Sequence, residues 1–256
     1  MSSPKPRVKK TPPPRTPLNT DRVVRAAIAL ADKEGIDSLN MRELAQALNV
    51  VPMAIYKHVA NKEELLDAMV DVIVSEIDPP NLDVVWKEGV RQRILSAREA
   101  LLRHPWVPRV IETRTHASLI VLDYMNSLTG IFRSGGFTVD LTHHVMHALG
   151  SRMWGFMQEV FPTETQPDVS PQELQKMFDQ LAQRFPYLIE MAQSKPHDKS
   201  TGNLQGCDDQ FEFEFALDAL LERFEQLHTQ GWSSFAPKGP KNRSLETLAR
   251  EKKVKK

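Results

Sequence analysis

The stretch Asn40 to Lys62, NMRELAQALNVVPMAIYKHVANK, predicts two short helices joined by a tight turn, followed by the start of another helix. Asn40 can cap the first of these helices, with Glu43 three residues later as its capping-box partner. Asn49 then interrupts the helix, because asparagine tolerates the left-handed conformation that a sharp turn needs. Pro52 suits the first turn of the second helix, where its missing N–H group needs no partner. This spacing predicts a helix-turn-helix, whose second helix presents its N-terminal residues to base edges in the major groove.

Helices are also predicted on both sides of this stretch. A first helix is expected to run from Thr20, its cap, to Gly35, because apolar residues recur along one face and glycine commonly ends a helix. A later helix starts at Asn61, with Glu64 as its capping-box partner, and is stopped by the pair Pro79–Pro80. We therefore end a DNA-binding domain at this pair, with the last helix connecting it to the rest of the chain.

On these residues the sequence resembles the TetR family of bacterial transcriptional regulators. The matching pieces are Arg22–Leu30, Gly35–Ile36, Met41–Ala45, Val50 and Ile55–Leu66. The run from Tyr56 to Leu66 is highly specific, because a Tyr-x-His-(Val or Phe)-x-Asn-Lys tail is much rarer than a helix-turn-helix pattern alone. Four later pieces resemble the C-terminal domain of the tetracycline repressor, namely Ala100–Pro105, Phe132–Phe137, His147–Gly150 and Phe211–Leu220.

Helical periodicity in the remaining sequence and this resemblance together predict an all-α fold. We expect an N-terminal three-helix helix-turn-helix DNA-binding domain plus a larger helical ligand-binding and dimerisation domain. The expected divisions are a disordered basic arm at 1–18, the DNA-binding domain at 19–80, the ligand-binding and dimerisation domain at 81–231, and a disordered basic tail at 232–256. The arm has five Lys/Arg, six prolines and no acid, so it either follows the DNA backbone or acts only as a solubilising tail.

The composition restricts the class of protein. A formal net charge of zero argues against a protein that merely coats nucleic acid, but it allows a sequence-specific binder with local positive charge. Cys207 is the only cysteine, which excludes an intrachain disulfide or a CxxC site and fits a cytoplasmic location. No apolar segment follows the basic N-terminus and no run is long enough to span a bilayer, so neither a secretory signal nor a membrane partner is expected.

A helix-turn-helix at this position would direct eight side chains toward DNA: Arg42, Pro52, Met53, Ala54, Tyr56, Lys57, His58 and Lys62. Arg42 can bind O6 and N7 of a guanine with two hydrogen bonds, and Lys57 can reach a base or a phosphate. Lys62 suits a phosphate, because backbone N–H groups at a helix start also face an anion. For Tyr56 and His58, the alternative role is packing inside the DNA-binding domain. For the whole motif, the alternative is a three-helix core without a role in nucleic-acid binding.

Sequence-specific binding also implies a homodimer. One DNA-binding domain covers only a few base pairs, so tight binding needs two such domains on a near-palindromic double-stranded DNA operator. The helices expected at 141–161 and 209–229 are the best candidates for the interface, since both are long and the second carries a long apolar stripe. The resemblance implies that they pack against the same helices of the partner as a four-helix bundle. Burial of both helices inside one monomer is the alternative.

The C-terminal part is rich in aromatic, methionine and histidine residues, which suits a mostly apolar pocket with a few polar groups that orient a small-molecule effector. The candidate ligand-binding residues are Trp106, Arg109, Arg114, His116, Tyr124, Met125, His147, Ser151, Trp154, Gln158 and Glu159. Each of them could equally be part of the protein core. The sequence does not identify the effector.

Tetracycline with magnesium can be tested against the residues that the resemblance aligns with the tetracycline repressor's pocket. Ile111 stands where that pocket has a metal-binding histidine, Asp78 stands in place of another histidine, and Arg93 replaces an asparagine. Glu159 falls where the pocket has a glutamate. Three departures against one match predict that this chain does not sense tetracycline.

The predicted function is a dimeric transcriptional repressor that a small hydrophobic ligand releases from a palindromic operator, and other functions have less support in the sequence. His143 and His147 are four residues apart on a predicted helix, but no third ligand stands at a suitable spacing, so neither a metal site nor any other cofactor is predicted. The sequence shows no catalytic triad or Gly-rich phosphate loop, which disfavours an enzyme. The remaining alternative is a constitutive or protein-partner-controlled DNA-binding regulator that has no small-molecule effector.

Overall fold

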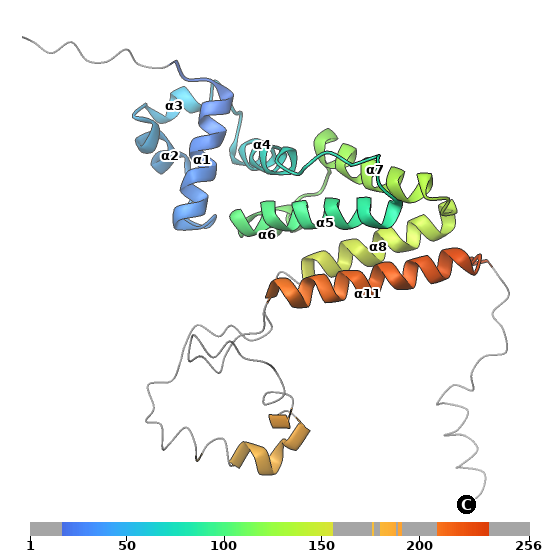
Figure 1. The fold of residues 1–256 in the computed structure, drawn as a ribbon. Coiled ribbons are helices and arrows are strands. Elements are labelled where there is room, and N and C mark those ends of the chain that lie inside the picture. Colours follow the sequence, from blue (N-terminus) through green and yellow to red (C-terminus); the bar gives the residue numbers. More distant parts are fainter. Residues whose placement is uncertain (1–16, 156–175, 177–179, 188, 191–208, 236–256) are drawn as a thin grey trace, which may run out of the picture. The chain divides into compact units, whose positions relative to one another are not determined.

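A computed structural model describes residues 17–155, 176, 180–187, 189–190 and 209–235. The described residues contain helices and no β-strand, which confirms the predicted all-α class (Figure 1). The chain divides into two compact units, residues 1–135 and residues 136–256. The domain limits expected from the sequence remain predictions. No helix in the described part of the chain is both long and apolar enough to cross a bilayer.

The first three helices, which we call the head, are α1 (Thr20–Glu34), α2 (Met41–Leu48) and α3 (Pro52–Ile55). The side chain of Asn40 accepts hydrogen bonds from the backbone N–H groups of Arg42 and Glu43, which confirms the predicted cap of α2. Asn49 adopts φ 55° and ψ 47° and ends α2 in the left-handed conformation. Pro52 is the first residue of α3. The turn that the sequence predicts is therefore present.

The cap of α1 differs from the prediction. Asn19 is the cap, because its side chain accepts a hydrogen bond from the N–H of Arg22 at 2.8 Å, and Thr20 is the first helical residue. Thr20 instead donates its hydroxyl hydrogen to the carbonyl oxygen of His58 at 3.3 Å. This contact ties the start of α1 to the turn that follows α3.

Helix α4 (Lys62–Ser75) lies between the head and the next three helices and packs against α1, α5, α6 and α7. Its cap is Asn61, as predicted, but the carboxylate of Glu64 accepts from the N–H of Ala60, one residue before the expected donor. The helix ends at Ser75, before the Pro79–Pro80 pair that was expected to stop it.

Contacts with α5 account for this early end. The carbonyl oxygen of Ile77 accepts from Arg93 at 3.3 Å, and the N–H of Asp78 donates to the hydroxyl of Ser96 at 2.9 Å. These backbone groups are therefore paired with another helix instead of continuing their own.

The rest of the first unit consists of α5 (Trp86–Arg103), α6 (Val107–Glu112) and α7 (Leu119–Ser134). Ser118 caps α7 and Gly135 ends it. Helix α7 packs against both α4 and α5, so a shift of α7 relative to α5 also affects α4.

The second unit contains α8 (Val139–Gly155) and α11 (Asp209–Thr229), which pack against each other. The bounds of α11 confirm the helix predicted at 209–229. Residues 156–161 of the other predicted interface helix lie outside the described residues. After α11, the carboxylate of Asp140 accepts hydrogen bonds from Ser233 and Ser234, so the chain stays in contact with α8 as far as Ser234.

Candidate nucleic-acid interface and effector site

The residues expected to read DNA lie on α2, α3, the turn after α3 and the first residue of α4. Burial of Leu44, Leu48 and Ile55 fixes the orientation of the two short helices and leaves their other faces outward. Arg42, Pro52, Lys57 and Lys62 are exposed, and so are Met53 (70%) and Tyr56 (43%). Ala54 and His58 are half-buried. All eight predicted residues thus keep some accessible surface within one short stretch of the head.

Lys62 has a structural contact that the sequence did not reveal. Its Nζ donates a hydrogen bond to the carbonyl oxygen of Leu39 at 2.8 Å. The start of α4 is thereby tied to the loop before α2. An ammonium group has three donors, so this bond leaves capacity for a phosphate, and the phosphate role of Lys62 remains a prediction.

Polar contacts join the head to α6 and its flanking residues. Oδ1 of Asp32, on α1, accepts from the indole N–H of Trp106 at 2.6 Å and lies 2.8 Å from Nδ1 of His104. Asp37, in the loop after α1, forms an ion pair with Arg109 of α6. Trp106 is only 5% exposed, so its indole depends on Asp32 for a hydrogen-bond acceptor.

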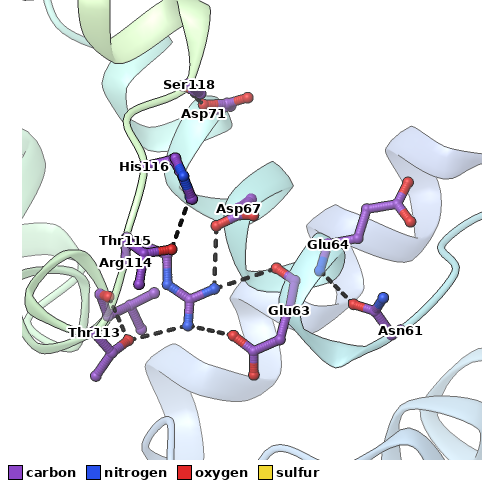
Figure 2. A network of polar contacts seen from close by, with 11 residues as sticks. Asn61, Glu63, Glu64, Asp67, Asp71, Thr113, Arg114, Thr115, His116 and Ser118 are labelled. Carbon is purple, nitrogen blue, oxygen red and sulfur yellow. Dashed lines mark hydrogen bonds and ion pairs between the residues drawn. The ribbon is translucent and has the colours of Figure 1, made fainter.

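Arg114, two residues after the end of α6, joins the segment between α6 and α7 to α4 (Figure 2). Nη2 of its guanidinium lies 2.6 Å from the Glu63 carboxylate, and Nη1 lies 3.1 Å from that of Asp67. Desolvation alone would lower the pKa of Arg114, but hydrogen bonds and charges from Asp67 and Glu63 outweigh it and hold the pKa above its usual value. One turn further along α4, Asp71 accepts a hydrogen bond from Ser118. The segment 114–118 is thus bonded to two turns of α4.

A second polar cluster lies between α5 and α7. Arg93 of α5 is 8% exposed, and its guanidinium carbon lies 4.7 Å from the centre of the Tyr124 ring on α7. Nη1 donates to the carbonyl of Ile77, and Nη2 donates to the hydroxyl of Ser127 at 3.1 Å. Burial raises the pKa of Tyr124 to about 12, so its hydroxyl stays protonated at neutral pH. In the sequence, Arg93 stands out only as a departure from the tetracycline repressor's pocket.

The predicted ligand-binding residues do not form one group in the described structure. Trp106, Arg109 and Arg114 contact acidic residues of α1, α4 and the loop after α1. His116 is exposed and pairs with the hydroxyl of the adjacent Thr115. Tyr124 and Met125 lie on α7, and His147 lies on α8 in the other unit. The side chains of Ser151 and Trp154, and residues Gln158 and Glu159, lie outside the described residues.

The three residues that depart from the tetracycline repressor's pocket lie in different surroundings in the structure. Ile111 is half-buried on α6, Asp78 is exposed after α4, and Arg93 is buried. The rings of His143 and His147 lie 4.6 Å apart on α8. Among the described residues, no group of three His, Cys, Asp or Glu side chains is arranged to hold a metal ion.

Two family models match this chain. Residues 79–227 match the tetracyclin repressor-like C-terminal domain, and residues 23–69 match the tetR family of bacterial regulatory proteins. These two ranges contain most of the head and of α4, and the helices α5 to α8.

Individual relatives support the same assignment. The HTH-type transcriptional repressor DrrR1 of Streptomyces coeruleorubidus is 33% identical over 127 residues, which is 49% of this chain and 47% of that protein. The chain thus spans about half the length of the relatives it matches.

Solved structures extend the likeness in three dimensions. ActR of Streptomyces coelicolor in complex with actinorhodin matches with a TM-score of 0.63 and 26% identity, over 82% of this chain and 98% of ActR. BioQ bound to its double-stranded DNA operator matches with a TM-score of 0.50 and 29% identity, over 55% of this chain and 86% of BioQ. With a family model covering more than half of its residues, the chain belongs to the TetR family of bacterial regulatory proteins.

Proposed function

We propose that this protein is a dimeric transcriptional repressor in the cytoplasm, released from a palindromic DNA operator when a small hydrophobic ligand binds the helices after the head. The observation that carries the proposal is the set of bonds by which α6 and the segment 114–118 hold α1 and α4. Support comes from the relatives, since DrrR1 is a repressor, ActR binds actinorhodin and BioQ binds an operator. That the matched relatives are transcriptional regulators also supports the prediction that the chain is not an enzyme.

The proposed mechanism couples ligand binding to the orientation of the head. Helix α4 packs against α1 on one side and against α5, α6 and α7 on the other. A ligand that displaces α6 or α7 changes the bonds that Asp32, Asp67 and Asp71 make with the residues flanking these helices. The head then moves with α1 and α4, and two heads in a dimer no longer match the spacing of the half-sites.

We expect α11 to supply part of the dimer interface. Its Phe215 ring is 65% exposed in the single chain and stacks with that of Phe211 at a centroid distance of 6.5 Å. Large exposed aromatic rings on a long helix are typical of a surface that another chain covers. Phe215→Glu should therefore give a monomer by analytical ultracentrifugation and weaken operator binding. Phe235→Glu changes a ring that is also highly exposed but lies outside α11, so it should leave the dimer intact.

The function is tested by fluorescence anisotropy with DNA from upstream of the protein's own gene, at two salt concentrations and with a panel of hydrophobic compounds. A repressor of this kind binds its operator about a thousandfold or more tighter than random DNA, and one class of compound reduces this affinity. Specific binding that no compound changes would favour a constitutive or protein-partner-controlled regulator. No preference over random DNA would contradict the proposal.

A further inference from the structure

The stacked Arg93–Tyr124 pair between α5 and α7 is incompletely bonded. Nε of Arg93 and the hydroxyl oxygen of Tyr124 are both buried and have no hydrogen-bond partner among the described residues. Each is a donor, because a guanidinium only donates and the Tyr124 phenol stays protonated at neutral pH. Buried donors without an acceptor are uncommon in folded proteins, and each costs free energy. What the pair lacks is therefore an acceptor.

The positive charge of Arg93 also has no carboxylate in contact with it in the described structure. None of the described residues forms a salt bridge with its guanidinium. Desolvation lowers the pKa of Arg93, and the electrostatic effects of Tyr124 and of the exposed Asp78 carboxylate oppose this only in part. Arg114 provides the contrast, since its Nε also lacks a partner but two carboxylates neutralise its charge. Of these two arginines, Arg93 is the one that still needs an anion.

A purely structural role does not require a cation at position 93. The two bonds that Arg93 makes, to the Ile77 carbonyl and the Ser127 hydroxyl, need only N–H donors, which a neutral amide can supply. Burying a guanidinium costs more than burying an amide unless an anion is present for at least part of the time. The surplus of charge and donors fits a site that a ligand completes.

We propose that the effector carries an anionic oxygen, as a carboxylate or an ionised phenol or enol, which binds Nε of Arg93 and the hydroxyl of Tyr124. This inference rests on the proposed function and specifies the chemical class of its effector. Ile120, one turn before Tyr124 on the same face of α7, is 37% exposed, so an apolar ring attached to the anion has a side chain against which to pack.

The burial of both donors gives the binding step a mechanical consequence. Because neither atom is accessible to solvent, an acceptor reaches them only when the Tyr124 ring or α7 itself moves. Helix α7 also packs against α4, which connects to the head. An effector that gains its hydrogen bonds only in the displaced state favours that state, and this difference in affinity is what an inducer requires.

The test uses two fluorescent probes with the same ring system and the full-length protein. 8-Anilinonaphthalene-1-sulfonate carries an anionic group, whereas N-phenyl-1-naphthylamine lacks it. Arg93→Gln should weaken binding of the anionic probe about tenfold or more, because a charge-assisted hydrogen bond is lost, and should change binding of the neutral probe by less than about twofold. Lys33→Gln, which removes an exposed cation from α1, should change neither affinity.

Tyr124→Phe provides a second variant that keeps the shape of the ring and is used if Arg93→Gln does not fold. It should weaken the anionic probe by several-fold and leave the neutral probe unchanged. Equal losses for both probes would mean that the substitutions damaged a cavity and not an anion site. An unchanged affinity of Arg93→Gln for the anionic probe, or a wild type that binds this probe no better than the neutral one, would also overturn the inference.

Failure of this inference is distinguishable from failure of the proposed function. Operator binding and its release are measured by DNA anisotropy with acid and methyl-ester pairs of aromatic compounds. Release by esters alone would overturn the anion site while keeping the repressor. Absence of operator binding would refute the proposed repressor function, and the two probes would still decide whether Arg93 binds anions.

Discussion

Replacement of Asp32 by alanine should weaken the junction between α1 and α6 more than its position near the surface suggests. The carboxylate accepts from the indole N–H of Trp106 at 2.6 Å and lies 2.8 Å from Nδ1 of His104. Because Trp106 is almost fully buried, its N–H cannot exchange the lost acceptor for water. The alanine variant therefore leaves a buried donor without a partner.

The size of the effect follows from this burial. A buried donor that loses its acceptor costs about 1–3 kcal/mol, and a hydrogen bond to a charged group is at the upper end of this range. We expect Asp32→Ala to lower the free energy of unfolding by about 2 kcal/mol. For a chain of this size, that corresponds to a decrease in Tm of about 4–8 °C.

The assay is urea-induced unfolding followed by circular dichroism, with two control variants. Asp37→Ala breaks the ion pair with Arg109. The side chains of Asp37 and Arg109 are 75% and 65% exposed, so this variant should lose no more than about 1 kcal/mol of unfolding free energy. Asp32→Asn keeps an acceptor oxygen for Trp106 and should recover most of the loss. If Asp32→Ala and Asp37→Ala lose the same free energy, or if Asp32→Asn is no better than Asp32→Ala, the reasoning from the buried indole is wrong.

Three further predictions concern binding, coupling and the C-terminal segment. Arg42→Ala should lose about 1–3 kcal/mol of operator binding and relax discrimination at one base pair, whereas Lys62→Ala should weaken binding to all DNA sequences alike. Equal losses of affinity for operator and random DNA in Arg42→Ala would contradict a base-reading role. Arg114→Gln should lower stability by about 1 kcal/mol or less, since its acidic partners are more than half exposed, but reduce the effector-induced change in operator affinity about fivefold. Arg25→Gln, which breaks an ion pair inside α1, should leave that change as it is. Hydrogen bonds from Ser234 hold the pKa of Asp140 below its usual value of 3.8, so the ionised carboxylate stabilises the segment 232–235 at neutral pH and this stabilisation is lost as the pH falls through the lowered pKa. Asp140→Asn should accelerate hydrogen exchange in this segment at neutral pH. Unchanged exchange would count against the contact.

The turn of the helix-turn-helix was predictable because its signals are local. The cap at Asn40, the left-handed residue Asn49 and the first-turn proline Pro52 each act within three or four residues. The same reasoning misassigned the cap of α1, where Asn19 and Thr20 are adjacent and both are good capping residues. Sequence alone does not say which of two suitable neighbours bonds to the helix.

Features that depend on distant residues were not predictable in this way. The end of α4 at Ser75 follows from hydrogen bonds that Ile77 and Asp78 make with α5, and no local signal precedes the prolines. Arg93 was missed as a site residue for a similar reason, because its burial depends on Tyr124 of another helix. A signal did exist: position 93 falls on the apolar face of α5, where a charged residue needs an explanation.

The bonds between the head and the residues around α6 also bear on how such regulators can be recombined. In the three contacts that involve Asp32, Asp37 and Asp67, the acid lies on α1, α4 or the loop between α1 and α2, and the donor comes from α6 or its flanks. A chimera that carries another protein's α1 to α4 would keep the donors and lose the acids unless the graft has them at the same places. A change of DNA specificity by grafting another head onto this chain is therefore limited to heads that carry acids at these three positions.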